Sequence, residues 1–146
     1  MNLQYREMRR EDIAVVTPLF MEYWNGMGDE WTAERVYSRI WQVLGSPDAY
    51  CVIAEKGEKV VGFAMGRFET YSDLTAYDLI EIIVAPEHQN CGIGTAMMTE
   101  LENRVKSMGA AMIQLISVND AMHERFYGKQ GYGDASNLKL KSKFLY

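Results

Sequence analysis

The sequence predicts one α/β or α+β domain in which helices flank a central mixed sheet. The chain has 146 residues, the length of one ordinary domain, so we expect a single domain over 1–146. Hydrophobic residues make up 48% and charged residues 24%, which is typical of a globular fold. Segments with the two-residue period of a strand are interspersed with segments of helical period.

The N-terminal third predicts a strand and two helices. Apolar and polar residues alternate over Leu3–Met8, which indicates a short strand. Apolar residues recur with helical spacing over Glu11–Tyr23, where Pro18 predicts a kink or a later helix start. A second helical pattern covers Ala33–Leu44, and Thr32 can cap it.

The middle of the chain predicts three strands. Tyr50–Glu55 and Lys59–Phe68 are apolar runs on either side of Lys56-Gly57-Glu58, which is a hairpin signal. A third buried strand is predicted over Asp78–Val84. Pro86 ends it, because proline cannot continue a central ladder.

The C-terminal third begins with the longest predicted helix, Gly92–Met108. A buried strand is predicted over Ala111–Val118, followed by a short helix over Asp120–Gln130 with Asn119 as its cap. Leucines alternate with lysines at the start of Leu138–Tyr146, which predicts a final strand.

Charge and residue counts exclude several functions. The 15 Lys and Arg against 20 Asp and Glu give a net charge of −5, which disfavours nucleic-acid binding. Two cysteines, Cys51 and Cys91, and two histidines, His88 and His123, are too few for a disulfide framework or a histidine-rich metal site. We therefore expect no metal. No apolar run is long enough for a membrane span and Met1–Arg10 is polar, so we expect a cytoplasmic protein without a membrane partner.

A glycine-containing loop joins the strand ending at Val84 to the longest helix. Gly92 and Gly94 allow the backbone to approach a ligand closely, and the following helix start offers free N–H groups and a positive dipole end. This combination suits a diphosphate. No Gly-Lys-Ser/Thr follows, and Met97 stands where a dinucleotide motif has its third glycine. The spacing alone leaves an ordinary helix-entry loop equally open.

The pattern Gln89-x-x-Gly92-x-Gly94 resembles the acetyl-CoA signature of the GCN5-related N-acetyltransferase (GNAT) family, Gln/Arg-x-x-Gly-x-Gly/Ala. Residues 81–87 resemble the end of that family's fourth strand. The exit of the fifth strand and the next helix are matched by Asn119, Ala121, Phe126-Tyr127 and Gly131-Tyr132. The resemblance covers essentially the whole chain and is strongest over 78–132. It implies a GNAT-like, mostly antiparallel sheet in which strands four and five splay apart.

The resemblance implies acetyl-CoA as co-substrate, with pantetheine in the gap between the splayed strands. Main-chain groups of Ile83 and Val84 then bond the pantetheine amides, while Asn119 and Phe126 line the cofactor site. Cys91 departs from the family pattern, which often has a basic residue there. The backbone N–H groups expected at the pyrophosphate belong to Gln89, Asn90, Cys91, Gly92, Ile93, Gly94 and Thr95.

Acetyl transfer to an amine requires a proton acceptor for the ammonium and a proton donor for the departing thiolate. Glu81 lies in the apolar run Leu79–Val84, where burial raises a carboxyl pKa toward that of a general base. A paired structural carboxylate is an equal alternative. Tyr127 resembles the family tyrosine that faces the cofactor sulfur and acts as general acid. The alternative is a core aromatic residue beside Phe126.

We therefore expect an acetyl-CoA-dependent N-acetyltransferase that acetylates a primary amine of a small molecule directly, in a ternary complex. Aromatic and acidic residues of the N-terminal helices, such as Trp24, Trp31 and Asp29, suit a cationic amine. Two alternatives stay open. One is a weakly catalytic acyl-CoA-binding or sensing domain, and the other is a protein or peptide N-acetyltransferase. Homodimers are common in the family.

Overall fold

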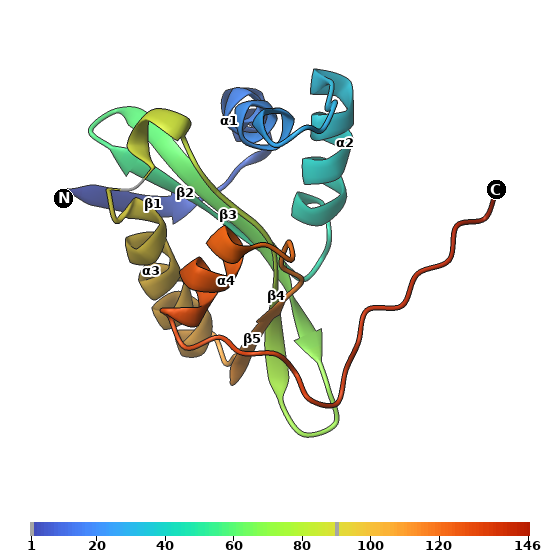
Figure 1. Cartoon of the computed structure of the whole chain (residues 1–146). Helices are drawn as coiled ribbons and strands as arrows, with labels where there is room; N and C mark the ends of the chain where they lie inside the picture. The colour runs from blue at the N-terminus through green and yellow to red at the C-terminus, as the bar shows by residue number, and fades with distance from the viewer. Residues whose placement is uncertain (1, 90) are drawn as a thin grey trace. The chain divides into compact units, whose positions relative to one another are not determined.

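The computed structural model describes residues 2–89 and 91–146. These residues form two compact units, divided between Ile116 and Ser117, and each is described by itself. The larger unit contains a sheet and three α-helices, and the smaller contains the helix α4 (Figure 1).

The sheet of the larger unit has five strands in the order of the sequence. They are β1 (Leu3–Glu7), β2 (Ala49–Lys56), β3 (Lys59–Thr70), β4 (Thr75–Val84) and β5 (Met112–Leu115). Neighbouring strands are antiparallel except β4 and β5, which are parallel. The predicted mixed, mostly antiparallel sheet is confirmed.

Two helices cover one face of this sheet. A short 3-10 turn, η1 (Arg10–Asp12), leads into α1 (Ile13–Gly26), which continues through Pro18, and α2 (Ala33–Leu44) follows. The Thr32 hydroxyl accepts the Arg35 N–H at 3.2 Å, so the predicted cap of α2 is confirmed. The core beneath these helices draws on α1, α2 and three strands, with fully buried members including Val16, Phe20, Ile40, Ile53, Phe63 and Met65.

The helix α3 (Ile93–Ser107) packs on the opposite face of the sheet (Figure 1). Its apolar side is buried through Met97, Met98 and Leu101. A Cβ on Gly62 of β3 would lie 2.8 Å from the Ile83 carbonyl oxygen of β4 and 2.8 Å from the Met97 sulfur, so glycine is required at this position. A second 3-10 turn, η2 (Pro86–His88), lies between β4 and α3.

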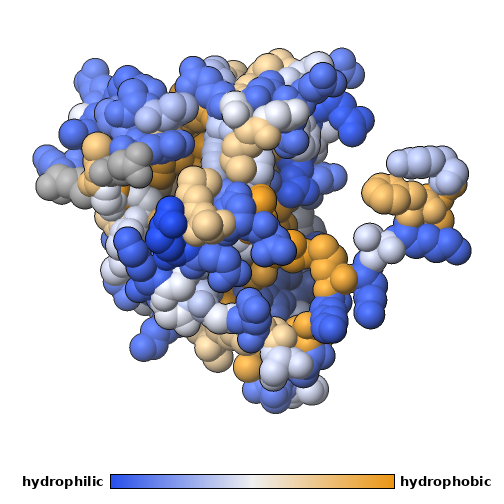
Figure 2. Space-filling model, in the orientation of Figure 1, coloured by the Kyte–Doolittle hydropathy of each residue, from blue (hydrophilic) through white to orange (hydrophobic). Residues whose placement is uncertain are grey.

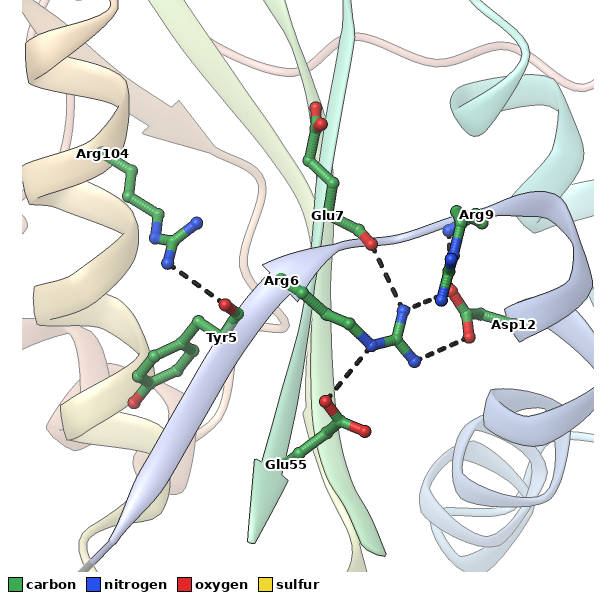
Figure 3. Close-up of polar contacts among 7 residues, drawn as sticks. All are labelled: Tyr5, Arg6, Glu7, Arg9, Asp12, Glu55 and Arg104. Atoms are coloured by element: carbon green, nitrogen blue, oxygen red, sulfur yellow. Dashed lines mark hydrogen bonds and ion pairs between the residues drawn. The ribbon is translucent and has the colours of Figure 1, made fainter. Parts of the chain in front are cut away.

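A network of charged groups fixes β1 to its neighbours (Figure 3). The Arg6 guanidinium donates to both oxygens of Asp12, at 2.8 and 2.9 Å, and its Nε donates to Glu55 of β2 at 3.2 Å. Asp12 also accepts the Arg9 backbone N–H at 2.7 Å. From the other side of the strand, Arg104 of α3 donates to the Tyr5 carbonyl at 3.3 Å. The network therefore links β1, β2 and the start of α1.

The smaller unit corrects two predictions. Its helix α4 (Ala121–Gly128) is capped by Asp120, whose carboxylate accepts the His123 N–H at 2.8 Å, and not by Asn119. The final strand predicted over Leu138–Tyr146 is wrong, because this segment has no regular secondary structure. Its hydrophobic side chains are exposed (Figure 2), with Leu140 at 74%, so the alternating pattern has no buried face to pack against.

None of the described helices is long and apolar enough to cross a membrane. Over residues 2–89 and 91–146, no group of three or more His, Cys, Asp or Glu side chains is placed to hold a metal ion.

Candidate functional site

The strands β4 and β5 pair along only part of their neighbouring edge. Ala76–Leu79 pair with Met112–Leu115, and over the described residues the ladder stops there although β4 runs on to Val84. The second half of β4, from Ile80 to Val84, therefore has an edge toward β5 without a strand partner. The ladder stops because β5 itself ends at Leu115, so the splay of strands four and five that the resemblance implies stays a prediction.

The register with β3 shows which backbone groups face that open edge. The Ala85 N–H donates to the Val61 carbonyl of β3 at 2.8 Å. Because peptide groups alternate in direction along an antiparallel strand, those of Ile83 face β3 and those of Val84 face the open edge. The Val84 carbonyl accepts a bond of 3.1 Å from the Gln89 side-chain amide. The start of the glycine loop is thereby tied to the end of β4.

A β-bulge in β4 determines where Glu81 points. Met65 of β3 lies opposite Glu81, and the next residue, Gly66, lies opposite Leu79, so Ile80 is an extra residue. The bulge reverses the alternation and places Glu81 on the face covered by α1 and α2. A Cβ on Gly66 would lie 2.6 Å from the Tyr77 ring, so glycine is required opposite the bulge.

Glu81 is buried and both of its carboxylate oxygens accept hydrogen bonds. Its side chain is only 9% exposed. The Trp24 indole N–H of α1 donates to Oε1 at 3.0 Å, and Arg39 of α2 donates to Oε2 at 3.2 Å. Burial raises the pKa of Glu81 above its usual value, while the charge and hydrogen bond of Arg39 and the bond from Trp24 act in the opposite direction. The site therefore holds a carboxylate that is at once ion-paired and more basic than usual.

Arg39 is a residue that the sequence analysis missed. It lies 42 positions from Glu81 in the sequence. It belongs to α2, where the helical spacing of the apolar residues identified the helix and its buried side but not the role of its arginines. Nothing in the local sequence distinguishes it from an exposed helical arginine.

The aromatic residues of the N-terminal helices do not all gather at Glu81. Trp24 contacts the carboxylate directly. Trp31 packs edge-on against Phe20 of the core, with ring centroids 4.9 Å apart, and its N–H donates to Asp29 at 3.2 Å. Trp41 lies under the guanidinium of Arg10 at 4.2 Å. Of these three tryptophans, only Trp24 makes a hydrogen bond to Glu81 in the described structure.

The glycine loop presents the start of α3. Gly92 has a φ of +80°, a left-handed conformation that favours glycine, and it occupies the N-cap without a side-chain cap bond. The first backbone N–H groups of the helix belong to Ile93, Gly94 and Thr95. Cys91 is exposed, with its sulfur 3.5 Å from the Gln89 carbonyl oxygen. The loop residue Asn90 lies outside the described residues.

The smaller unit holds the remaining predicted residues. Tyr127 is half-buried, and its ring packs edge-on against Phe126 and Tyr132, with centroids 5.0 and 6.0 Å away. Asn119 is exposed and immediately precedes the helix cap Asp120.

The mostly antiparallel sheet, the edge of β4 that runs on past the end of β5, and the glycine-led helix after β4 match the acetyltransferase framework that the resemblance implied. The sequence model of the acetyltransferase (GNAT) family matches residues 15–132. The chain therefore belongs to this family.

Solved structures share the fold at low sequence identity. A predicted acetyltransferase with acetyl-CoA from Clostridium acetobutylicum is 19% identical, with 96% of each chain covered and a TM-score of 0.74. Ribosomal-protein-alanine N-acetyltransferase from Brucella melitensis biovar Abortus 2308 is 16% identical, covering 99% of this chain and 100% of that one, with a TM-score of 0.78. Glucosamine-6-phosphate N-acetyltransferase from Arabidopsis thaliana is 18% identical, with both chains fully covered and a TM-score of 0.70. No curated protein matches the chain.

Proposed function

We propose that the protein transfers the acetyl group of acetyl-CoA directly to a primary amine of a small molecule, within a ternary complex. The observation that carries this proposal is Glu81, a buried carboxylate of raised pKa at the bulge of β4, beside the strand's open edge. A base in this position answers the main chemical requirement of the reaction, which is to deprotonate an ammonium ion.

The residues of the larger unit fit acetyl-CoA. The open edge of β4 offers the peptide groups of Val84 to the amides of pantetheine. Those of Ile83 face β3, which corrects the expectation that Ile83 also bonds pantetheine through its main chain. The start of α3 offers N–H groups and the positive end of a helix dipole to the pyrophosphate. A similar structure was solved with acetyl-CoA. We assign the pyrophosphate to the loop residues Gln89, Asn90, Cys91, Gly92, Ile93, Gly94 and Thr95.

The proposed mechanism uses two side chains for proton transfer. Glu81 accepts a proton from the ammonium form of the acceptor, through the lone pairs that Trp24 and Arg39 leave on its oxygens. The neutral amine attacks the acetyl carbonyl carbon, the new C–N bond forms, and the C–S bond breaks. Tyr127 gives its proton to the departing sulfur and regains one from the nitrogen, which carries a surplus proton once the C–N bond has formed. The roles of Tyr127, Asn119 and Phe126 rest on the resemblance of their sequence motif.

Similar structures carry names with different acceptors, a ribosomal protein alanine in one and glucosamine 6-phosphate in another. Two alternatives to the proposal are therefore kept. One is a protein or peptide acceptor, and the other is a domain that binds acyl-CoA without transferring the acyl group. We further propose that the enzyme works in the cytoplasm and can form a homodimer, as is common in the family. The two free thiols, Cys51 and Cys91, support a reducing compartment.

The test is acetyl-CoA-dependent thiol release, measured over simple amines, amino acids, amino sugars, aminoglycosides and peptides. We expect saturable release with a small primary amine and its loss in Glu81→Gln protein that still binds CoA. Release with peptides alone would replace the small-molecule acceptor. CoA binding without release for any acceptor would instead support a sensing domain.

A further inference from the structure

A hollow of about 270 Å³ opens beside Glu81 on the face of the sheet that α1 and α2 cover. Its lining comes from α2, β3 and the β4 bulge, and consists of Arg39, Gln42, Val43, Arg67 and Ile80. Two features connect it with the proposed base. Ile80 is the bulge residue directly before Glu81, and Arg39 donates to the Glu81 carboxylate.

The hollow is lined by two positive charges and by no acidic residue. Arg39 reaches Glu81 at 3.2 Å and Arg67 reaches Glu69 at 3.5 Å, in each case through one terminal nitrogen. A guanidinium carries N–H groups on all three of its nitrogens. Within residues 2–89 and 91–146, the other two nitrogens of each guanidinium have no hydrogen-bond partner.

Solvent can reach both arginines, since their side chains are 33% and 48% exposed. The third carboxylate near the hollow is Asp78, which lies opposite Arg67 in the register of β3 and β4. Asp78 accepts a hydrogen bond from Gln114 of β5 instead. The free donors of the hollow therefore favour an anion, and guanidinium groups bind carboxylates and phosphates through paired hydrogen bonds.

We infer that the acceptor carries an anionic group, a carboxylate or a phosphate, close to its primary amine, and that this group binds between Arg39 and Arg67. The inference rests on the proposed function, in which Glu81 receives the proton of the amine. Because Arg39 touches both the hollow and Glu81, an anion held there leaves the rest of a small acceptor beside the base. The anionic group is an addition to the cationic amine that Trp31 and Asp29 suggested, and in the structure those two side chains bond each other.

The direct test compares acceptors with and without the anion, each pair assayed over a range of pH so that differences in amine pKa are accounted for. One pair is an α-amino acid and its amide, and the other is glucosamine 6-phosphate and glucosamine. We expect the anionic member of one pair to have a kcat/KM at least about tenfold higher, and that pair identifies the group as carboxylate or phosphate. Equal or better acetylation of the neutral member in both pairs would overturn the inference.

Three variants test whether the hollow is the cause of the preference for anionic acceptors. Arg67→Gln should raise KM for the anionic acceptor by about tenfold with kcat nearly unchanged, and should leave the neutral partner unaffected. Arg67→Lys should recover part of the loss. Arg35→Gln is the matched control, because Arg35 is an exposed arginine of α2 that does not line the hollow. If Arg67→Gln behaves like Arg35→Gln, the inference is wrong.

A binding measurement separates this inference from the proposed function. Inorganic phosphate is titrated by calorimetry into protein saturated with CoA, so that the glycine loop is already filled. Saturable binding that Arg67→Gln abolishes supports the anion site even if no amine is acetylated. Absence of phosphate binding to the wild type, together with no preference for anionic acceptors, contradicts the site while leaving acetyl transfer itself intact.

Discussion

The indole nitrogen of Trp24 lies 3.0 Å from Oε1 of Glu81, a residue 57 positions further along the chain. This bond and the one from Arg39 join both N-terminal helices to the bulge of β4. The helices therefore do more than cover the core, since they supply the two side chains that hold and tune the buried carboxylate.

The cofactor loop is tested by two substitutions at one position. Gly92→Asp should weaken CoA binding by more than tenfold, because it adds a negative charge beside the pyrophosphate. Gly92→Asn is the matched control, since asparagine meets the same demand for a positive φ without the charge. Calorimetry on folded protein measures both affinities. Equal affinity for the two variants would argue against a pyrophosphate at this loop.

Bound CoA should protect Cys91 from an alkylating reagent. Cys91 is exposed on the loop, whereas Cys51 is 3% exposed and burial raises the pKa of its thiol to about 11. Labelling of the native protein therefore reports Cys91, and Cys91→Ser provides the blank. Mass spectrometry should show slower labelling with saturating CoA. An unchanged rate would place the cofactor elsewhere.

Tyr127→Phe removes one hydroxyl and little volume. If that hydroxyl protonates the leaving thiolate, kcat should fall by about 100-fold while acetyl-CoA affinity stays nearly the same. Tyr132→Phe is a suitable comparison, because it removes the hydroxyl of a ring packed 6.0 Å from that of Tyr127. Steady-state kinetics and CoA titration measure both effects. Activity near the wild-type rate would return Tyr127 to the role of a packing aromatic residue.

Asp12→Asn should destabilise the fold by about 2 kcal/mol at neutral pH, because it breaks the paired bonds from Arg6. Those bonds hold the pKa of Asp12 below its usual value. Their contribution is therefore present above the unfolded-state pKa and is lost as pH falls through the folded-state pKa. Urea denaturation should show the difference from wild type shrinking below about pH 4.

Glu69→Gln is the control for this charge effect, since its contact with Arg67 is exposed and should contribute less than about 1 kcal/mol. A loss of stability in Asp12→Asn that does not depend on pH would point to packing and not to the ion pair.

The sequence predicted the elements whose signal is local. The Thr32 cap, the Gly57 hairpin and the long helix after Gly92 all appear, because each depends on residues a few positions apart. The segment Leu138–Tyr146 shows the limit of such reasoning. An alternating pattern becomes a strand only when a buried face and a partner edge exist, and the pattern specifies neither.

In the candidate site, too, the sequence predicted what a local pattern marks and missed what depends on contacts made by folding. Glu81 stood out as a charge in an apolar run, and the structure confirms its burial. The bulge at Ile80 and the contact with Arg39 could not be predicted, since each depends on a partner strand or helix brought near by folding. The hollow between Arg39 and Arg67 combines a helix and a strand in the same way.

Glu81 is the proposed base for acetyl transfer, and the pH dependence of kcat/KM tests this role. Burial raises the pKa of Glu81, so the wild-type rate should fall with decreasing pH along a limb above the usual carboxyl range. Trp24→Phe removes a bond that lowers this pKa, so the limb should move to higher pH. Glu81→Gln should lose at least about 100-fold in rate and lose the limb.

The same profile is measured with a second acceptor of lower amine pKa, because a limb set by the amine would move with the acceptor while one set by Glu81 would stay. If Glu81 is the base, the limb responds to Trp24→Phe and not to the acceptor. A Glu81→Gln enzyme with the wild-type rate and an unchanged limb would contradict this role.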